Sequence, residues 1–238
     1  GEVKLMYRVF LDFEMHPIPY KYSEIRRRCM SEIIEIGAVM LDDKLEEIDS
    51  YKAMVKPHYA ERIFANIVSL TGITHHKLEH AEEFDIAFPK FVEWCVGAGD
   101  EFKIYSWSAS DLMQVKDELK IKEVKVEGNV KKMLDNWIDF QEDFTKILGL
   151  KDTPSLSKAV RMAGYEFTGK MHDALFDARN TGRLFKLAQN KEDLIATYKM
   201  YDKTVKASKE KTPATQTLGS MFDFSQFEFT ADNQDESQ

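Results

Sequence analysis

A chain of 238 residues can bury one sizeable core, and this length favours a single domain with extensions over two full domains. Apolar residues make up 43% and charged residues 31% of it, and no apolar run could cross a bilayer, so we expect no membrane segment and, by default, a cytoplasmic location. The net charge of −8 disfavours non-specific binding of long duplexes, and the distant Cys29 and Cys95 indicate neither a disulfide framework nor a zinc site.

The N-terminal part of the chain predicts three strands. Residues Tyr7 to Glu14 form an apolar run that ends in acidic residues, which is typical of a buried strand whose carboxyl end opens on a site. Residues Ile33 to Leu41 and Ser50 to Val55 also have strand patterns. The polar turn at Asp42 to Lys44 lies between them, so a hairpin is their simplest arrangement.

Helical and strand patterns alternate in the middle of the chain. They predict, in order, a helix at 83–96, a strand at 102–106, a helix at 111–119, a strand at 130–134, and helices at 140–148, 155–163 and 173–189. Strands that first pair and are then interleaved with helices indicate an α/β protein with a mixed β-sheet flanked by α-helices. This arrangement is compatible with a ribonuclease H-like fold.

The pattern of a folded domain ends near Lys206. A last helix is expected from Glu192 to about Lys206, after which Thr, Ser, Gln, Asp and Glu dominate. We therefore predict one domain at 1–206 and a polar tail at 207–238. Residues 221–229 of the tail alternate apolar with mostly polar side chains, and they could dock as an edge strand on their own domain or on a protein partner.

Asp12 and Glu14 are candidate metal ligands at the end of the first strand. Because side chains of a strand alternate between its two faces, these two carboxylates lie on the same face. They repel each other unless a cation lies between them, and Mg²⁺ or Mn²⁺ prefers such oxygen ligands. A solvated strand end explains an Asp-x-Glu pair equally well when it occurs alone.

Asp111, His172 and Asp177 are the other candidates for chemistry. Asp111 follows a predicted strand at the start of a helix, where an ordinary helix-capping role would also explain it. His172 precedes a helix that has Asp177 in its first turn, so both can face one site, and a histidine can act as a general base near neutral pH. The alternative is an exposed histidine before a capped helix, with Asp177 paired to a nearby arginine.

The joint occurrence of these elements, in this order, is more specific than any one of them. Asp12 and Glu14 in LDFE, Asp111 in SWSASD, and His172 with Asp177 in HDALFDA match the three motifs of the DEDDh exonuclease superfamily. Within it, the chain resembles the group of Eri-type RNA exonucleases and KapD-like proteins, from about Tyr7 to Leu187. It departs from many relatives at Met15 and His16, where they carry Thr, and at Ser108, where they carry Gly.

The resemblance implies a metal-dependent 3′→5′ exonuclease with a histidine base. Asp12, Glu14 and Asp177 would hold one divalent cation, Asp12 and Asp111 the second, and His172 would deprotonate the attacking water. The substrate would be a single-stranded RNA or DNA 3′ end, and the products nucleoside 5′-monophosphates. Side chains next to the carboxylates could contact the terminal bases or could belong to the core; they are Phe13, Met15, Trp107 and Phe176.

A nuclease that binds a strand end needs only a small basic patch, for which the candidates are Arg26 to Arg28 and the group Lys158, Arg161 and Lys170.

Two other functions stay open at this point. One is a regulatory or nucleic-acid-binding protein that keeps the fold without turnover. The other is a proofreading subunit of a DNA polymerase, based on a loose likeness of residues 216–222 to peptides that bind sliding clamps.

Overall fold

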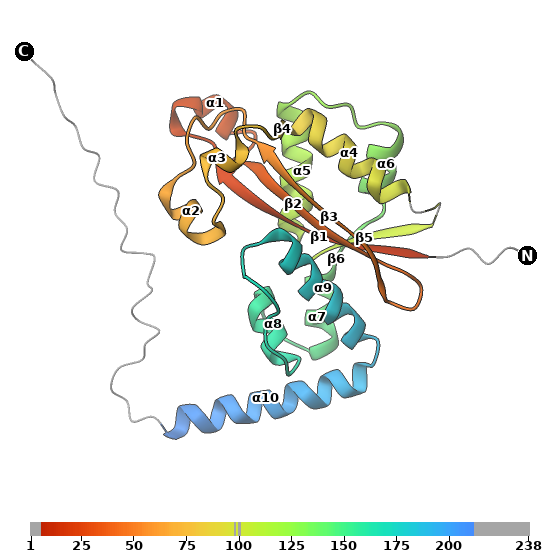
Figure 1. Ribbon diagram of the computed structural model, residues 1–238. Coiled ribbons are helices and arrows are strands. Elements are labelled where there is room, and N and C mark those ends of the chain that lie inside the picture. The colour runs from red at the N-terminus through yellow and green to blue at the C-terminus, as the bar shows by residue number, and fades with distance from the viewer. Residues whose placement is uncertain (1–5, 98, 100, 212–238) are drawn as a thin grey trace, which may run out of the picture. The chain divides into compact units, whose positions relative to one another are not determined.

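The computed structural model describes residues 6–97, 99 and 101–211. Over this part of the chain the strands form one six-stranded sheet in the order β4-β3-β2-β1-β5-β6 (Figure 1). Its strands are β1 (Tyr7–Pro17), β2 (Ser31–Leu41), β3 (Glu47–Lys56), β4 (Glu82–Glu83), β5 (Phe102–Ser106) and β6 (Trp137–Asp139). β2 is antiparallel to both β1 and β3, whereas β5 runs parallel to β1 and β6. The expected hairpin and mixed sheet are confirmed.

Helices cover both faces of this sheet (Figure 1). One face carries α4 (Phe84–Gly97), α5 (Ala109–Ile121) and α6 (Gly128–Asp135), and the opposite face carries α7 (Phe140–Leu148), α8 (Leu156–Met162) and α9 (Ala174–Ala188). Short elements follow β1 and β3, namely η1 (Tyr20–Tyr22), α1 (Ser23–Arg26), α2 (Ala65–Thr71) and α3 (His75–Leu78). The last element is α10 (Lys191–Lys211).

The alternation of β1 decides which face of the sheet carries the acidic residues. Val9, Leu11 and Phe13 pack into the core beneath α4, α5 and α6. Phe10 points to the opposite face, where its ring stacks on Tyr105 at 5.0 Å between ring centroids. Because side chains alternate along a strand, Asp12 and Glu14 share the face of Phe10. They therefore lie on the side of the sheet that α9 covers.

The first turn of α9 lies directly against β2 at Gly37. Gly37 pairs with Asp12 across the antiparallel ladder. A Cβ atom built on Gly37 would fall well inside van der Waals contact with the backbone of Ala174 and Leu175. Only glycine leaves room for this approach, which brings the start of α9 next to the acidic end of β1.

The sequence-based prediction of a strand at 130–134 is wrong, because these residues belong to helix α6. Val130, Met133 and Leu134 have the i, i+3, i+4 spacing of a helix face, and Met133 is fully buried in the core beneath α4. The parallel partner of β5 is instead the short strand β6 that follows. A segment of this length offers too few periods to separate the two patterns from sequence alone.

The chain divides into two compact units, Gly1–Tyr201 and Asp202–Gln238, and α10 contributes to each. The aromatic segment at 221–229 lies outside the described residues, so the predicted boundary near Lys206 and the docking of the tail stay predictions.

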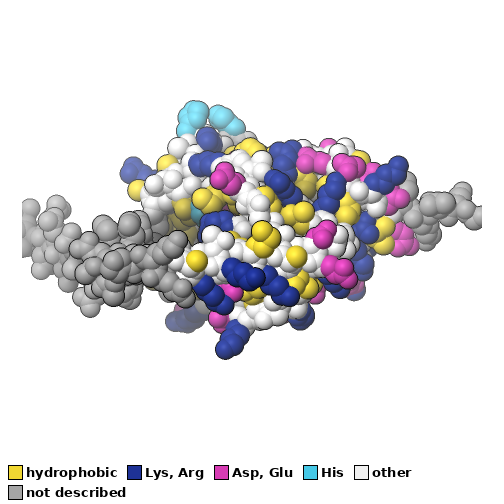
Figure 2. Space-filling model, turned by 90° about the horizontal axis from the view of Figure 1, so that it is seen from below, with side chains coloured by type: hydrophobic (Ala, Val, Ile, Leu, Met, Phe, Trp, Pro, Cys, Tyr) yellow, Lys and Arg dark blue, Asp and Glu magenta, His cyan; other side chains and the backbone are white. Residues whose placement is uncertain are grey.

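None of the helices in the described part of the chain has the length and apolar character that crossing a membrane requires. Figure 2 shows one face of the molecule, on which basic, acidic and apolar side chains are intermixed.

The contact at Gly37 yields a test of the fold. We expect Gly37→Ala to lower the free energy of unfolding by at least about 2 kcal/mol, because the added methyl group meets backbone that cannot rotate away. Gly97→Ala in α4 is the matched control, since its Cβ would meet no atom within 4 Å and should change stability by less than about 0.5 kcal/mol. Equal denaturation midpoints for the two variants would contradict the close approach.

Candidate active site

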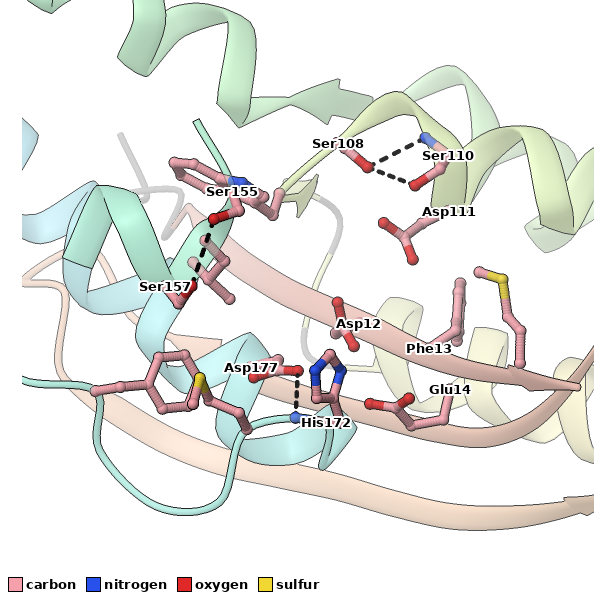
Figure 3. Close-up of a pocket in the computed structure, with 15 residues that line it drawn as sticks. Asp12, Phe13, Glu14, Ser108, Ser110, Asp111, Ser155, Ser157, His172 and Asp177 are labelled. Carbon is pink, nitrogen blue, oxygen red and sulfur yellow. Dashed lines mark hydrogen bonds between the residues drawn. The ribbon is translucent and has the colours of Figure 1, made fainter. Parts of the chain in front are cut away.

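Three separate elements bring the predicted carboxylates together (Figure 3). Asp12 and Glu14 come from β1, Asp111 from the first turn of α5, and Asp177 from the first turn of α9. β5 pairs in parallel with β1 and ends at Ser106 beside Leu11, so the chain that leaves β5 enters α5 next to Asp12. The three motifs, far apart in sequence, therefore meet at the carboxyl ends of β1 and β5.

A pocket of about 360 Å³ opens at this point. It is lined by all five residues predicted to carry chemistry and by three of the four predicted to contact substrate. Those eight residues are Asp12, Phe13, Glu14, Met15, Trp107, Asp111, His172 and Asp177. The sequence did not indicate the rest of the wall, which consists of Ser108, Ser110, Ser155, Leu156, Ser157, Phe167 and Met171.

Phe176 is the predicted substrate contact that the structure places elsewhere. It is not among the described residues that line the pocket, and its ring lies so close to Gly169 that a Cβ atom there would collide with it. On a helix, Phe176 is turned by about 100° from Asp177, and here its ring lies against Gly169 instead of in the pocket. Phe167 and Met171, from the loop before α9, provide the apolar surface on this side instead.

Phe13 and Trp107 line the pocket only with part of their rings. Phe13 is 5% exposed and packs edge-on against Phe91 in the core. Trp107 is 6% exposed, packs against Phe144, and donates its indole N–H to the carbonyl of Pro154 at 3.1 Å. Both side chains therefore act first as core residues, and their rings form a rigid floor for whatever enters the pocket.

The four carboxylates repel one another in a largely buried site. Burial raises the pKa of Asp12 well above its usual range, and the carboxylates of Asp111 and Asp177 raise it further. Burial and the neighbouring Asp177 raise the pKa of Glu14 to about 8. Burial also raises the pKa values of Asp111 and Asp177 to about 7, although backbone N–H groups that donate to each of them oppose the change.

This donor set fits a divalent cation. All four carboxylates supply hard oxygen ligands, and a positive ion between them would remove the repulsion that raises their pKa values. Ligand atoms of Glu14, His172 and Asp177 lie within 4.8 Å of one another, which is close enough to surround a single ion. His172 is thus within reach of the metal position, and its role needs a separate test.

His172 is held in an unusual backbone conformation. Its φ angle is +61°, which a residue with a side chain rarely adopts, and its N–H donates to Asp177 Oδ2 at 3.2 Å. The side chain is exposed at the rim of the pocket. Partial burial and the nearby Lys170 ammonium lower the pKa of the imidazole, which keeps its ring neutral and able to accept a proton at physiological pH.

The sequence analysis missed an ion-pair network around the buried Glu35 that holds the start of α9. Glu35 lies opposite Glu14 in the β1–β2 ladder, and its Oε2 accepts the N–H of Ala174 at 3.0 Å. Lys52 on β3 contacts Glu35 at 3.3 Å and Asp173 at 2.5 Å. Asp173 in turn caps α9 by accepting the N–H groups of Leu175 and Phe176. The only sequence signal was an acidic residue within an apolar strand.

Comparisons with known proteins identify the family of the chain. Residues 9–185 match the family RNase_T, described as Exonuclease. The chain is 24% identical over 164 residues to 3'-5' exoribonuclease 1 of Rattus norvegicus, a match that covers 65% of this chain and 46% of that protein. It is also 24% identical over 165 residues to the 3'-5' exonuclease crn-4 of Caenorhabditis elegans, covering 65% and 55%. The chain thus spans about half the length of these relatives.

Solved structures show the same fold. The nuclease domain of 3'hExo, a DEDDh family member bound to rAMP, superposes with a TM-score of 0.66 at 19% identity, covering 82% of this chain and 96% of that one. Exonuclease I of E. coli in complex with a dT13 oligonucleotide gives a TM-score of 0.61 at 15% identity, covering 82% and 43%. The predicted ribonuclease H-like fold is confirmed by these likenesses.

The raised pKa values predict how the metal-free protein responds to pH. In the unfolded chain these carboxyl groups ionise near pH 4, whereas in the folded chain Glu14, Asp111 and Asp177 keep protons up to about pH 7 to 8. The folded state therefore binds more protons in this window, and the free energy of unfolding should fall as pH rises from about 4 to 8.

Denaturant unfolding in EDTA at a series of pH values measures this slope. Asp177→Asn should flatten it and stabilise the metal-free protein at pH 8, whereas Asp152→Asn, which changes an exposed loop carboxylate, should leave it unchanged. Stability that is constant or rises over this window in the unmutated protein would contradict the proposed carboxylate repulsion.

Proposed function

The chain belongs to the RNase_T exonuclease family, and from this premise we propose that it is a metal-dependent 3′→5′ exonuclease acting on single-stranded nucleic-acid ends. It would hydrolyse the terminal phosphodiester bond and release nucleoside 5′-monophosphates. The observation that carries the proposal is the convergence of four carboxylates and His172 on one open pocket. The names of the relatives, which include 3'-5' exoribonuclease and 3'-5' exonuclease, support the direction of cleavage.

The carboxylates would serve as ligands for two divalent cations, Mg²⁺ or Mn²⁺. Asp12, Glu14 and Asp177 are assigned to one ion, and Asp12 together with Asp111 to the second. When bound, two such cations lower the pKa of the attacking water and stabilise the leaving 3′ oxygen. Because the side chains of Glu14, Asp111 and Asp177 are already buried, ordering them around the ions would cost little conformational entropy.

His172 would act as the general base. Its neutral ring, at the rim of the pocket, can take the proton of the attacking water on an imidazole nitrogen. The hydrogen bond from its backbone N–H to Asp177 holds the His172 backbone next to a proposed metal ligand, which keeps the residue at the pocket. The left-handed backbone at this residue is consistent with strain retained for function.

The walls of the pocket favour an unpaired strand end. Six apolar side chains give the pocket a lining that suits the faces of bases, namely Phe13, Met15, Trp107, Leu156, Phe167 and Met171. A volume of about 360 Å³ is at the small end of the usual range for ligand pockets, roughly 300–1,000 Å³. A terminal nucleotide that has left its duplex fits this description better than a base pair does.

The first test of this function is a nuclease assay on matched RNA and DNA strands labelled at the 5′ end, with Mg²⁺ or Mn²⁺. We expect stepwise shortening from the 3′ end that EDTA abolishes, and the ratio of the two rates gives the preferred sugar. Asp12→Asn should abolish shortening while the protein still unfolds cooperatively, because the shared ligand is lost without a change of shape. Binding without shortening in the unmutated protein would support a regulatory role instead.

A second test separates a base from a ligand at position 172. His172→Ala should lower kcat by roughly 10²–10⁴-fold, the usual contribution of general base catalysis, and should change the acid limb of the pH–rate profile. Calorimetric titration with Mn²⁺ should give nearly the same affinity as the unmutated protein. A variant that no longer binds Mn²⁺ would show that His172 is a metal ligand and that the assigned role is wrong.

A further inference from the structure

The segment Tyr20–Arg28, which forms η1 and α1, is a basic and aromatic surface directly after β1. It contains four basic residues and one acidic residue in a chain whose net charge is −8. The basic residues are Lys21, Arg26, Arg27 and Arg28. Such a local excess of positive charge on an otherwise acidic chain favours a negatively charged partner.

Tyr20 is the most exposed large hydrophobic side chain in the described part of the chain, at 80%. The guanidinium of Arg26 lies over its ring, 4.2 Å from the centroid, and also donates to the carbonyl of Ile18. One face of the ring is therefore supported by a residue that is itself tied to the backbone. The high exposure leaves the remaining ring surface open to solvent, in a preorganised position.

The segment is anchored to the body of the protein rather than being a loose loop. Ile18 is fully buried and its N–H donates to the carbonyl of Met30 at 2.9 Å. Gln114 on α5 donates at 2.7 Å to the carbonyl of Ser31, three residues after the segment, which ties the start of β2 to the helix that carries Asp111. Binding of a ligand here would therefore cost little conformational entropy, because the surface is already ordered.

Arg28 is the basic side chain that the fold leaves available. Lys21 pairs with Glu61 at 2.5 Å and Arg27 with Glu24 at 2.8 Å, so both charges are partly satisfied within the protein. Arg28 is exposed, and its side chain has no ion-pair or hydrogen-bond partner among the residues described by the structure. It can bind an anion without breaking an existing contact.

The position of this surface relative to the pocket indicates its ligand. Met15 lines the pocket, and the five residues from there to Tyr20 can span at most roughly 17 Å. A strand whose 3′ end occupies the pocket has to continue over neighbouring surface. Aromatic rings combined with Arg side chains are the usual means of holding an unpaired strand without reading its sequence.

We propose that the Tyr20–Arg28 segment binds the single strand a few nucleotides upstream of its 3′ end, with a base stacked on Tyr20 and a phosphate at Arg28. The inference rests on the proposed function, because that function places the 3′ end in the pocket. It adds a second contact region outside the pocket. This region would make affinity depend on strand length while leaving the chemistry of the terminal bond untouched.

The test compares two substrates. Binding of a fluorescent single-stranded 20-mer is measured by anisotropy in Ca²⁺, and hydrolysis of a dinucleotide is measured in Mn²⁺. Tyr20→Ala should weaken 20-mer binding on the order of 10-fold, and Tyr20→Phe should bind like the unmutated protein. Arg28→Gln should weaken binding and reduce the slope of log affinity against log salt concentration by about 0.7.

Two controls make the result specific. Lys131→Gln removes an exposed charge of α6 that pairs with Asp135, and it should change neither affinity nor salt slope. All four variants should hydrolyse the dinucleotide with kcat/KM within about twofold of the unmutated protein, because a dinucleotide in the pocket does not extend to the segment.

The outcomes separate this inference from the proposed function. Unchanged 20-mer affinity in Tyr20→Ala and Arg28→Gln would overturn the inference even if the unmutated protein cleaves the strand. The surface would then have to bind something other than the strand, such as a protein partner. Length-dependent binding that these variants weaken, without any cleavage by the unmutated protein, would support the inference and refute the exonuclease. A protein that neither binds nor cleaves the strand would refute both.

Discussion

The contact between the first turn of α9 and Gly37 on β2 is the constraint on which the site depends. Gly37 faces Asp12 across the ladder, so whatever lies on Gly37 lies beside the acidic end of β1. Because this position has no side chain, the backbone of α9 packs directly against the sheet. Asp177 on α9 therefore lies next to the carboxylates of β1. A larger residue would separate two of the three motifs that make up the pocket.

The close contact between α9 and β2 brings several carboxylates together, and other groups of the protein offset only part of their negative charge. The N-terminus of α9 places the positive end of its helix dipole over the site, where its first N–H groups donate to Glu35 and Asp173. Glu35 accepts one of those N–H groups and pairs with Lys52, which neutralises the carboxylate directly opposite Glu14. Asp12, Glu14, Asp111 and Asp177 remain without a cationic side chain of their own in the described contacts, and their raised pKa values measure that imbalance. The repulsion between these carboxylates is therefore expected to lower the stability of the metal-free protein, and cation binding is expected to restore it.

The loop before α9 is ordered by side chains that lie outside the three motifs. Asn180, one turn into the helix beyond Asp177, donates to the carbonyl of Thr168 and accepts its N–H, which fixes the chain on which Phe167 and Met171 are carried. Lys170 donates to the carbonyl of Thr71 at the end of α2 at 2.9 Å. These contacts hold the loop at Thr168 and Lys170, close in sequence to Phe167, Met171 and the left-handed backbone of His172.

The sequence by itself determined the fold class, most elements and the five candidate residues for chemistry, because these depend on local periodicity and on short motifs at element ends. It could not distinguish helix from strand at 130–134, where only a few apolar residues carried the pattern. The tertiary structure alone decided that Phe176 turns away from the pocket while Phe167 and Met171 line it, and that Glu35 and Lys52 fix α9. Two of the contacts that hold α9, Glu35 with Ala174 and Lys52 with Asp173, join residues more than a hundred positions apart, and no local sequence pattern records which distant backbone will lie against a given side chain.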